Sequence, residues 1–76
     1  MPDNEVQLDV RGMLCPLPVL KARKRLKDLH AGAVLKVEAT DPVSVIDFPN
    51  YCNESGHELV DQAERDGVYT FWIRKQ

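Results

Sequence analysis

Four glycines divide this chain into short stretches, and their spacing restricts the fold more than any other feature. Each stretch between two of them holds only one or two elements, so the chain predicts a small domain of closely spaced strands and helices. Its 76 residues fall below the usual domain size of about 100 to 200, which predicts one domain over residues 1–76. A chain this short buries only about 60% of the surface that its unfolded form exposes. We therefore expect a carrier, a binding module or one-residue chemistry, with no enclosed cofactor pocket.

Composition and charge narrow the class further. Apolar residues make up 43% and charged residues 29%, which is typical of a globular chain. A net charge of −2 argues against sequence-independent nucleic-acid binding, and we expect no nucleic-acid partner. No apolar run reaches about 18 residues, and the first ten residues lack the pattern of a signal peptide, so we expect no membrane contact. Two cysteines do not make the disulfide framework of a small secreted protein. These features predict a cytoplasmic location with free thiols.

Hydrophobic periodicity predicts the element order βαβαββ. We expect strands at residues 6–10, 34–40, 58–64 and 68–74, and helices from Cys15-Pro16 to about His30 and from Asp41-Pro42 to Gly56. Pro49 is expected to split the second helix, and Asp66-Gly67 predicts a hairpin turn. The fold class is α/β, a two-layer sandwich in which a mixed four-stranded sheet carries both helices on one face. Trp72 alternates with its neighbours and is expected on the open face.

Cys15 is the leading candidate for chemistry. We place it at the N-cap of the first helix, where partial positive charge favours a thiolate. Pro16 and Pro18 carry no N–H, which leaves mainly the N–H groups of Cys15 and Leu17 to stabilise an anion. We expect a modestly lowered pKa for an exposed Cys15 thiol that the prolines orient. Gly12, which ends the preceding strand pattern, is a supporting residue.

The surroundings of Cys15 in sequence favour a carrier over a dithiol exchanger. Pro18 occupies the place where a Cys-x-x-Cys redox site needs its second cysteine, so no near neighbour can attack a persulfide on Cys15. Cys52, on the second helix, is expected to be a buried structural thiol, and a resolving or second sulfur site is its alternative. Neither cysteine has a ligand partner two to four residues away, so we expect no metal site and no cofactor.

The first helix predicts a docking surface beside Cys15. The apolar residues expected to face the sheet are Val19, Ala22, Leu26 and Leu29. Leu17 and Leu20 fall on the open side, among bases that include Lys21 and Lys24. One interpretation is a surface for an acidic partner, in which leucines make contact and bases steer. The other is a solvated basic face with incidental leucines.

The segment 8–18, LDVRGMLCPLP, resembles the signature of the TusA/SirA-like sulfur carrier family. The resemblance continues through residues 19–24 and covers nearly the whole chain, including Asp41-Pro42 and residues 71–75. It implies a βαβαββ two-layer sandwich in which Cys15 accepts sulfur as a persulfide. The donor would be a cysteine desulfurase or a rhodanese-like protein, and the recipient an acceptor protein. Destinations within the family include 2-thiouridine in tRNA, molybdenum-cofactor supply and sulfur trafficking in sulfur-oxidising bacteria.

Two residues beside the cysteine depart from the tRNA-thiolating member of that family. Leu14 stands in place of an arginine and Leu17 in place of a glutamate, and both changes lower the local polarity. These two differences argue against a role in tRNA thiolation more than they argue against sulfur transfer by Cys15. We expect a monomeric, sulfurtransferase-like carrier. The alternative is a regulatory or adaptor module that binds a protein or nucleic acid and uses Cys15 as a redox sensor.

Overall fold

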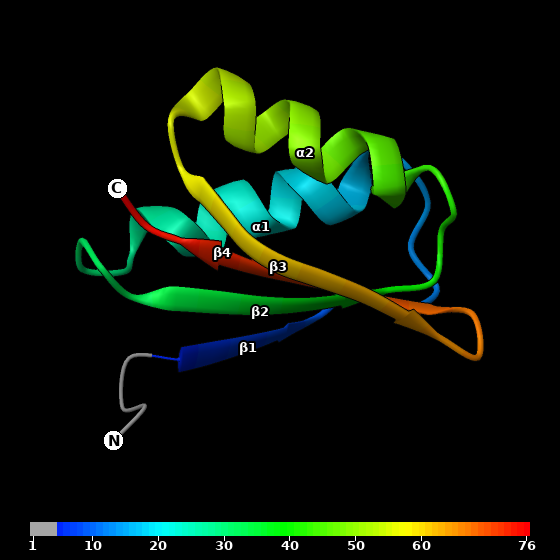
Figure 1. The fold of residues 1–76 in the computed structure, drawn as a ribbon. Coiled ribbons are helices and arrows are strands. Elements are labelled where there is room, and N and C mark those ends of the chain that lie inside the picture. Colours follow the sequence, from blue (N-terminus) through cyan, green and yellow to red (C-terminus); the bar gives the residue numbers. More distant parts are fainter. Residues whose placement is uncertain (1–4) are drawn as a thin grey trace.

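A computed structural model describes residues 5–76 and confirms the element order βαβαββ (Figure 1). The strands are β1 (Glu5–Asp9), β2 (Val34–Ala39), β3 (Glu58–Arg65) and β4 (Val68–Arg74), and the helices are α1 (Leu17–Lys27) and α2 (Ser44–Ser55). The strands form one mixed sheet in the order β1-β2-β4-β3. Both helices cover the same face of this sheet (Figure 1), which confirms the predicted two-layer sandwich.

The pairing of β1 with β2 positions the loops that matter for function. These two strands run parallel, with Asp9 opposite Glu38, whereas β4 pairs antiparallel with both β2 and β3. Parallel neighbours end at the same edge of a sheet. The loop that follows β1 and the loop that follows β2 therefore lie side by side, and the first of them contains Cys15.

The core lies between the sheet and the helices. Phe48 of α2 stacks on Phe71 of β4 with ring centroids 4.6 Å apart, and both side chains are almost fully buried. The other members of the buried core are Val10, Ala22, Leu26, Leu35, Val37, Ala39, Cys52 and Ile73. Ala22 and Leu26 are buried and Val19 and Leu29 pack against the core, as predicted for the inner face of α1.

Several predicted helix boundaries are wrong. Helix α1 begins at Leu17 with Pro16 as N-cap and ends at Lys27, so it stops before His30. The Lys75 ammonium donates to the Leu26 carbonyl oxygen at 2.7 Å and satisfies one of the acceptors at this helix end.

Helix α2 also differs from its prediction. It begins at Ser44 with Val43 as N-cap, later than Asp41-Pro42, and it runs unbroken through Pro49. A proline removes one backbone donor from a helix, and burial of Phe48 and Cys52 on the same helix offsets this loss. The helix ends at Gly56, whose φ of 85° is the left-handed conformation expected of a glycine C-cap.

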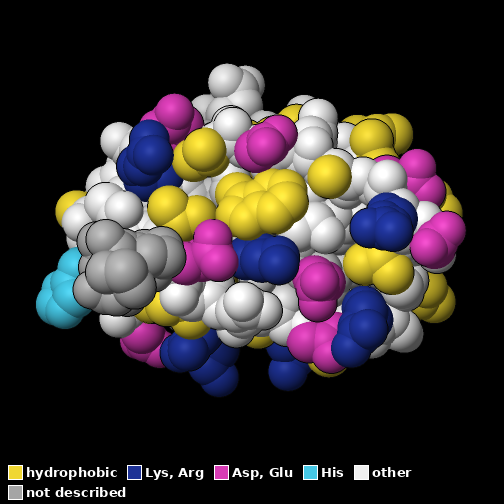
Figure 2. Space-filling model, turned by 60° about the horizontal axis from the view of Figure 1, so that its bottom comes forward, with side chains coloured by type: hydrophobic (Ala, Val, Ile, Leu, Met, Phe, Trp, Pro, Cys, Tyr) yellow, Lys and Arg dark blue, Asp and Glu magenta, His cyan; other side chains and the backbone are white. Residues whose placement is uncertain are grey.

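Among residues 5–76, no helix covers the opposite face of the sheet. Trp72 lies on this face, as predicted, opposite Lys36 in the β2–β4 pairing. The Lys36 ammonium lies 5.8 Å from the centroid of the Trp72 ring. Figure 2 shows this side of the molecule, where hydrophobic side chains lie scattered among Lys, Arg, Asp and Glu.

Candidate functional site

Cys15 lies in a turn ahead of α1 rather than at the N-cap of the helix. The Leu17 N–H donates to the Leu14 carbonyl oxygen at 2.9 Å, which makes Cys15 and Pro16 the two central residues of a β-turn. The peptide bond between them is cis. Cys15 is exposed, and both cysteines are free thiols. The expectation of an accessible, unbridged sulfur is confirmed, whereas the predicted N-cap position is wrong.

One buried carboxylate holds this turn in place. The Cys15 N–H donates to Asp41 Oδ2 at 2.7 Å, and the Val43 N–H donates to Asp41 Oδ1 at 3.1 Å. Asp41 is only 8% exposed. It therefore links the loop that contains Cys15 to the residues that lead into α2.

Gly12 supports the same loop through its backbone. Its N–H donates to the Thr40 hydroxyl oxygen at 2.9 Å, in the loop that follows β2. Its φ of 83° lies in the left-handed region, which a residue with a Cβ adopts only at a cost. A glycine is therefore the residue best suited to this bend.

The pKa of the Cys15 thiol is raised, which contradicts the predicted lowering. The largest cause is a hydrogen bond with the Asp47 carboxylate, followed by burial and by the charges of Asp47 and Asp41. The two N–H groups expected to stabilise an anion are engaged elsewhere, because Cys15 donates to Asp41 and Leu17 donates to Leu14. Negative charge next to the sulfur therefore favours the thiol form.

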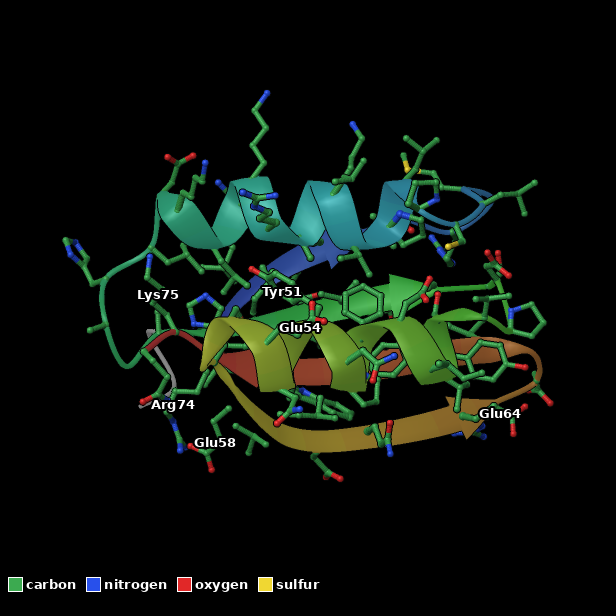
Figure 3. All side chains as sticks on the ribbon, turned by 90° about the horizontal axis from the view of Figure 1, so that it is seen from above. Tyr51, Glu54, Glu58, Glu64, Arg74 and Lys75 are labelled. Atoms are coloured by element: carbon green, nitrogen blue, oxygen red, sulfur yellow. The ribbon has the colours of Figure 1, made fainter. Side chains whose placement is uncertain are left out.

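Cys15 opens onto a groove between the two helices. The groove has a volume of about 710 Å³ and is lined by Cys15, Pro16, Val19, Leu20, Arg23, Lys27, Asp47, Asn50, Tyr51, Glu54, Ser55, His57 and Lys75. Figure 3 looks onto the helices and shows Tyr51 and Lys75 between them, with Lys75 toward the end where both helices finish. Acidic and basic side chains thus share one open groove that begins at the sulfur.

The predicted docking residues lie on the exposed side of α1. Leu17 is 49% and Leu20 is 48% exposed, and Lys21 and Lys24 are exposed as well. Leu20 lines the groove that Cys15 opens onto, whereas Lys21 and Lys24 line a second, smaller hollow together with Leu20.

Several neighbours of Cys15 in the structure are not predicted by local sequence patterns. Asp41 was expected only as a helix cap, and Asp47 was not singled out. Exposed apolar side chains also lie beside the cysteine in sequence, at Leu14, and at the start of α2, at Val43 and Ile46. The parallel pairing of β1 with β2 brings the loop containing Asp41 next to the loop containing Cys15.

Cys52 differs from Cys15 in every respect that governs reactivity. It is 4% exposed, and burial raises the pKa of its thiol to about 11. The prediction of a buried thiol is confirmed. A thiol that stays protonated and inaccessible is a poor nucleophile near neutral pH.

Neither metal coordination nor a membrane span is visible in the described part of the chain. Over residues 5–76, no group of three or more His, Cys, Asp or Glu side chains is arranged to hold a metal ion. Neither helix in that range has the length and apolar character needed to cross a bilayer.

The fold and the site define a class of protein: a small two-layer α/β sandwich that presents one free, exposed cysteine in the loop between its first strand and first helix. The chain belongs to the TusA family, because the family model described as "Sulfurtransferase TusA" matches residues 6–75.

Similar proteins agree with this assignment. The chain is 47% identical over 73 residues to "Sulfur carrier protein TusA" of Pseudomonas entomophila strain L48, which covers 96% of this chain and 91% of the relative. It is 48% identical over 69 residues to the protein of the same name from Pseudomonas putida strain W619, with 91% and 86% covered. A crystal structure of a SirA-like protein from Desulfitobacterium hafniense superposes with a TM-score of 0.80 at 30% identity, covering 90% of this chain and 93% of the other.

Proposed function

We propose that this protein is a sulfur carrier that accepts sulfur as a persulfide on Cys15 and passes it to an acceptor protein. The observation that carries the proposal is a free, exposed Cys15 whose backbone is fixed by the 2.7 Å hydrogen bond to Asp41. Relatives that share nearly half of its sequence bear the name sulfur carrier protein.

The transfer is an exchange at sulfur that needs no outside oxidant or reductant. The Cys15 sulfur loses its proton and bonds to the outer sulfur of a persulfide on the donor. The sulfur–sulfur bond of the donor breaks, and the donor cysteine leaves as a thiolate that takes up a proton. Cys15 then holds the outer sulfur as a persulfide, and the same exchange in the next step delivers it to the acceptor. No cofactor takes part.

The donor is a cysteine desulfurase or a rhodanese-like protein, and it docks next to Cys15. Leu17 and Leu20 supply apolar contact, and Lys21 and Lys24 attract an acidic partner surface. Leu14 extends this apolar surface beside the cysteine, because its side chain is 69% exposed. The carrier works as a cytoplasmic monomer that binds neither membranes nor nucleic acid directly. Its acceptor serves 2-thiouridine synthesis in tRNA or general sulfur trafficking and oxidation.

The raised pKa of Cys15 disfavours a peroxide-sensing role. Sensor cysteines react with peroxide as low-pKa thiolates, whereas the carboxylates beside Cys15 favour the thiol.

Intact mass spectrometry tests the proposal. The protein is incubated with a cysteine desulfurase and cysteine, and the mass gain is measured before and after a reductant. The wild type and the Cys52→Ser variant are expected to gain one sulfur atom that the reductant removes, and Cys15→Ser is expected to gain none. Sulfenic acid formation under peroxide, without sulfur loading, would support the sensor instead.

A further inference from the structure

Asp47 is a half-buried carboxylate with no counterion among the described residues. It lies in the first turn of α2 and lines the groove that begins at Cys15. Over residues 5–76 the ion pairs are Arg11–Asp9 and Arg74–Glu58, and neither involves Asp47. A partly buried carboxylate without an ion-pair partner is free to form an ion pair with a cationic side chain of another protein.

The Asp47 carboxylate is one of several charged groups that lie around Cys15 and along the groove. Asp41 is a second carboxylate next to the cysteine, and it already accepts hydrogen bonds from two backbone N–H groups. The remaining charged groups of the groove are Glu54 of α2, Arg23 and Lys27 of α1, and Lys75. Lys75 donates to the Leu26 carbonyl, at the far end of α1. The sulfur therefore has acidic neighbours close by and basic ones further along the groove.

We propose that Asp47 is a gate on Cys15: its carboxylate lines the same groove as the thiol, shields the thiol in the free protein, and receives a cationic side chain of the sulfur donor when that donor docks. This inference rests on the proposed function and specifies the partner. The donor must present Arg or Lys close to the cysteine that bears its persulfide. In the free protein the gate limits reaction of Cys15 with small electrophiles and repels small anionic reagents. Pairing of Asp47 with the donor's cation removes both effects only where sulfur is to be transferred.

The first test needs no donor and therefore stands apart from the proposed function. Alkylation of Cys15 by neutral iodoacetamide is followed against pH in the wild type and in Asp47→Asn. Removal of the Asp47 charge is expected to lower the pKa of the Cys15 thiol and so to raise its thiolate fraction near pH 7.5, and we expect a several-fold faster alkylation. The rate of alkylation by anionic iodoacetate is expected to rise more than the rate with iodoacetamide, because the Asp47→Asn change removes a local negative charge.

Two matched variants separate the gate from a structural effect. Glu54→Gln removes a carboxylate from the same helix and the same groove, and it is expected to leave the pH profile unchanged. Asp47→Glu keeps the charge and is expected to restore a profile close to the wild type. A profile for Asp47→Asn that superposes on the wild type would overturn the gate, as would an equal shift in Glu54→Gln.

The second test addresses the partner. With a desulfurase that loads wild-type Cys15, Asp47→Asn is expected to raise the KM for the carrier several-fold and to weaken the dependence of KM on salt. If the wild type loads normally and the KM of Asp47→Asn is unchanged, the partner contact is wrong while the carrier function stands. If the wild type does not load at all, the carrier function fails, and the alkylation profiles still decide the role of Asp47.

Discussion

The Cys15 backbone N–H and the Asp41 carboxylate, 26 positions apart in sequence, form a 2.7 Å hydrogen bond that joins the loop after β1 to the loop after β2. The second oxygen of Asp41 accepts from the Val43 N–H. One buried side chain thus fixes both the backbone of the proposed sulfur-bearing residue and the entry to α2.

Replacement of Asp41 by alanine is expected to lower both stability and sulfur loading. The change leaves two N–H groups without their acceptor, and loss of such partners costs about 1–3 kcal/mol. Urea unfolding measures the stability, and intact mass measures the rate of loading on Cys15.

Asp61→Ala is the control for this change, because Asp61 is an exposed aspartate on β3 whose carboxylate accepts a hydrogen bond from the N–H of its neighbour Gln62. We expect its free energy of unfolding to stay within about 0.5 kcal/mol of the wild type. Equal effects of the two substitutions would mean that the Asp41 bridge does not position Cys15.

Cys52→Ala is expected to destabilise the fold but to leave sulfur loading intact. Its side chain belongs to the core, and removal of a small buried group costs about 1 kcal/mol. Persulfide formation followed by intact mass should match the wild type. A loss of loading in a variant that remains folded would instead make Cys52 a second sulfur site.

The pH dependence of stability should reveal the buried Cys52 thiol. Burial raises its pKa from 9.0 to about 11, so between these values the folded state keeps a proton that the unfolded state has lost. Stability from this group is therefore complete below about pH 9 and is lost as the pH rises toward about 11. Urea midpoints from about pH 8 to about pH 10.5 should fall more steeply in the wild type than in Cys52→Ala. Parallel slopes would show that this thiol is not buried.

Leu17→Ser and Leu20→Ser are expected to weaken donor binding without unfolding the domain. Both side chains are about half exposed, so their loss should change stability by no more than about 0.5 kcal/mol. Loss of an apolar contact at an interface costs about 1 kcal/mol or more, which predicts at least about fivefold weaker binding by calorimetry. Val60→Ser, at an exposed position on β3, is the control. An unchanged affinity in both leucine variants would leave these residues as incidental surface.

The elements of the fold followed from local sequence signals, because each signal acts over a few residues. Asp66-Gly67 forms the predicted hairpin turn, with φ values of 53° and 83°, and Gly56 ends α2 where expected. Alternation in β4 placed Trp72 on the open face, since side chains on a strand point to opposite faces in turn. Pro49 misled the prediction because packing of α2 on the sheet outweighs one missing backbone donor.

The environment of the sulfur could not be predicted in the same way. The exposure of Cys15 followed from its place before a helix, but its pKa depends on Asp41 and Asp47, which only the folded chain brings close. Stabilisation of a thiolate by the helix start needs free N–H groups on Cys15 and Leu17, and both are engaged in hydrogen bonds. Local sequence therefore identified the candidate nucleophile, and tertiary contacts set its acidity.

A label chase tests the central claim most directly. The protein is loaded from a desulfurase and radiolabelled cysteine, freed of donor, and mixed with an acceptor protein. We predict that the wild type takes up one labelled, reductant-sensitive sulfur atom on Cys15 and that this label then moves to the acceptor. The Cys15→Ser variant is expected to take up no label. Label that is taken up without Cys15, or that never leaves the loaded wild type for any acceptor, would contradict the account.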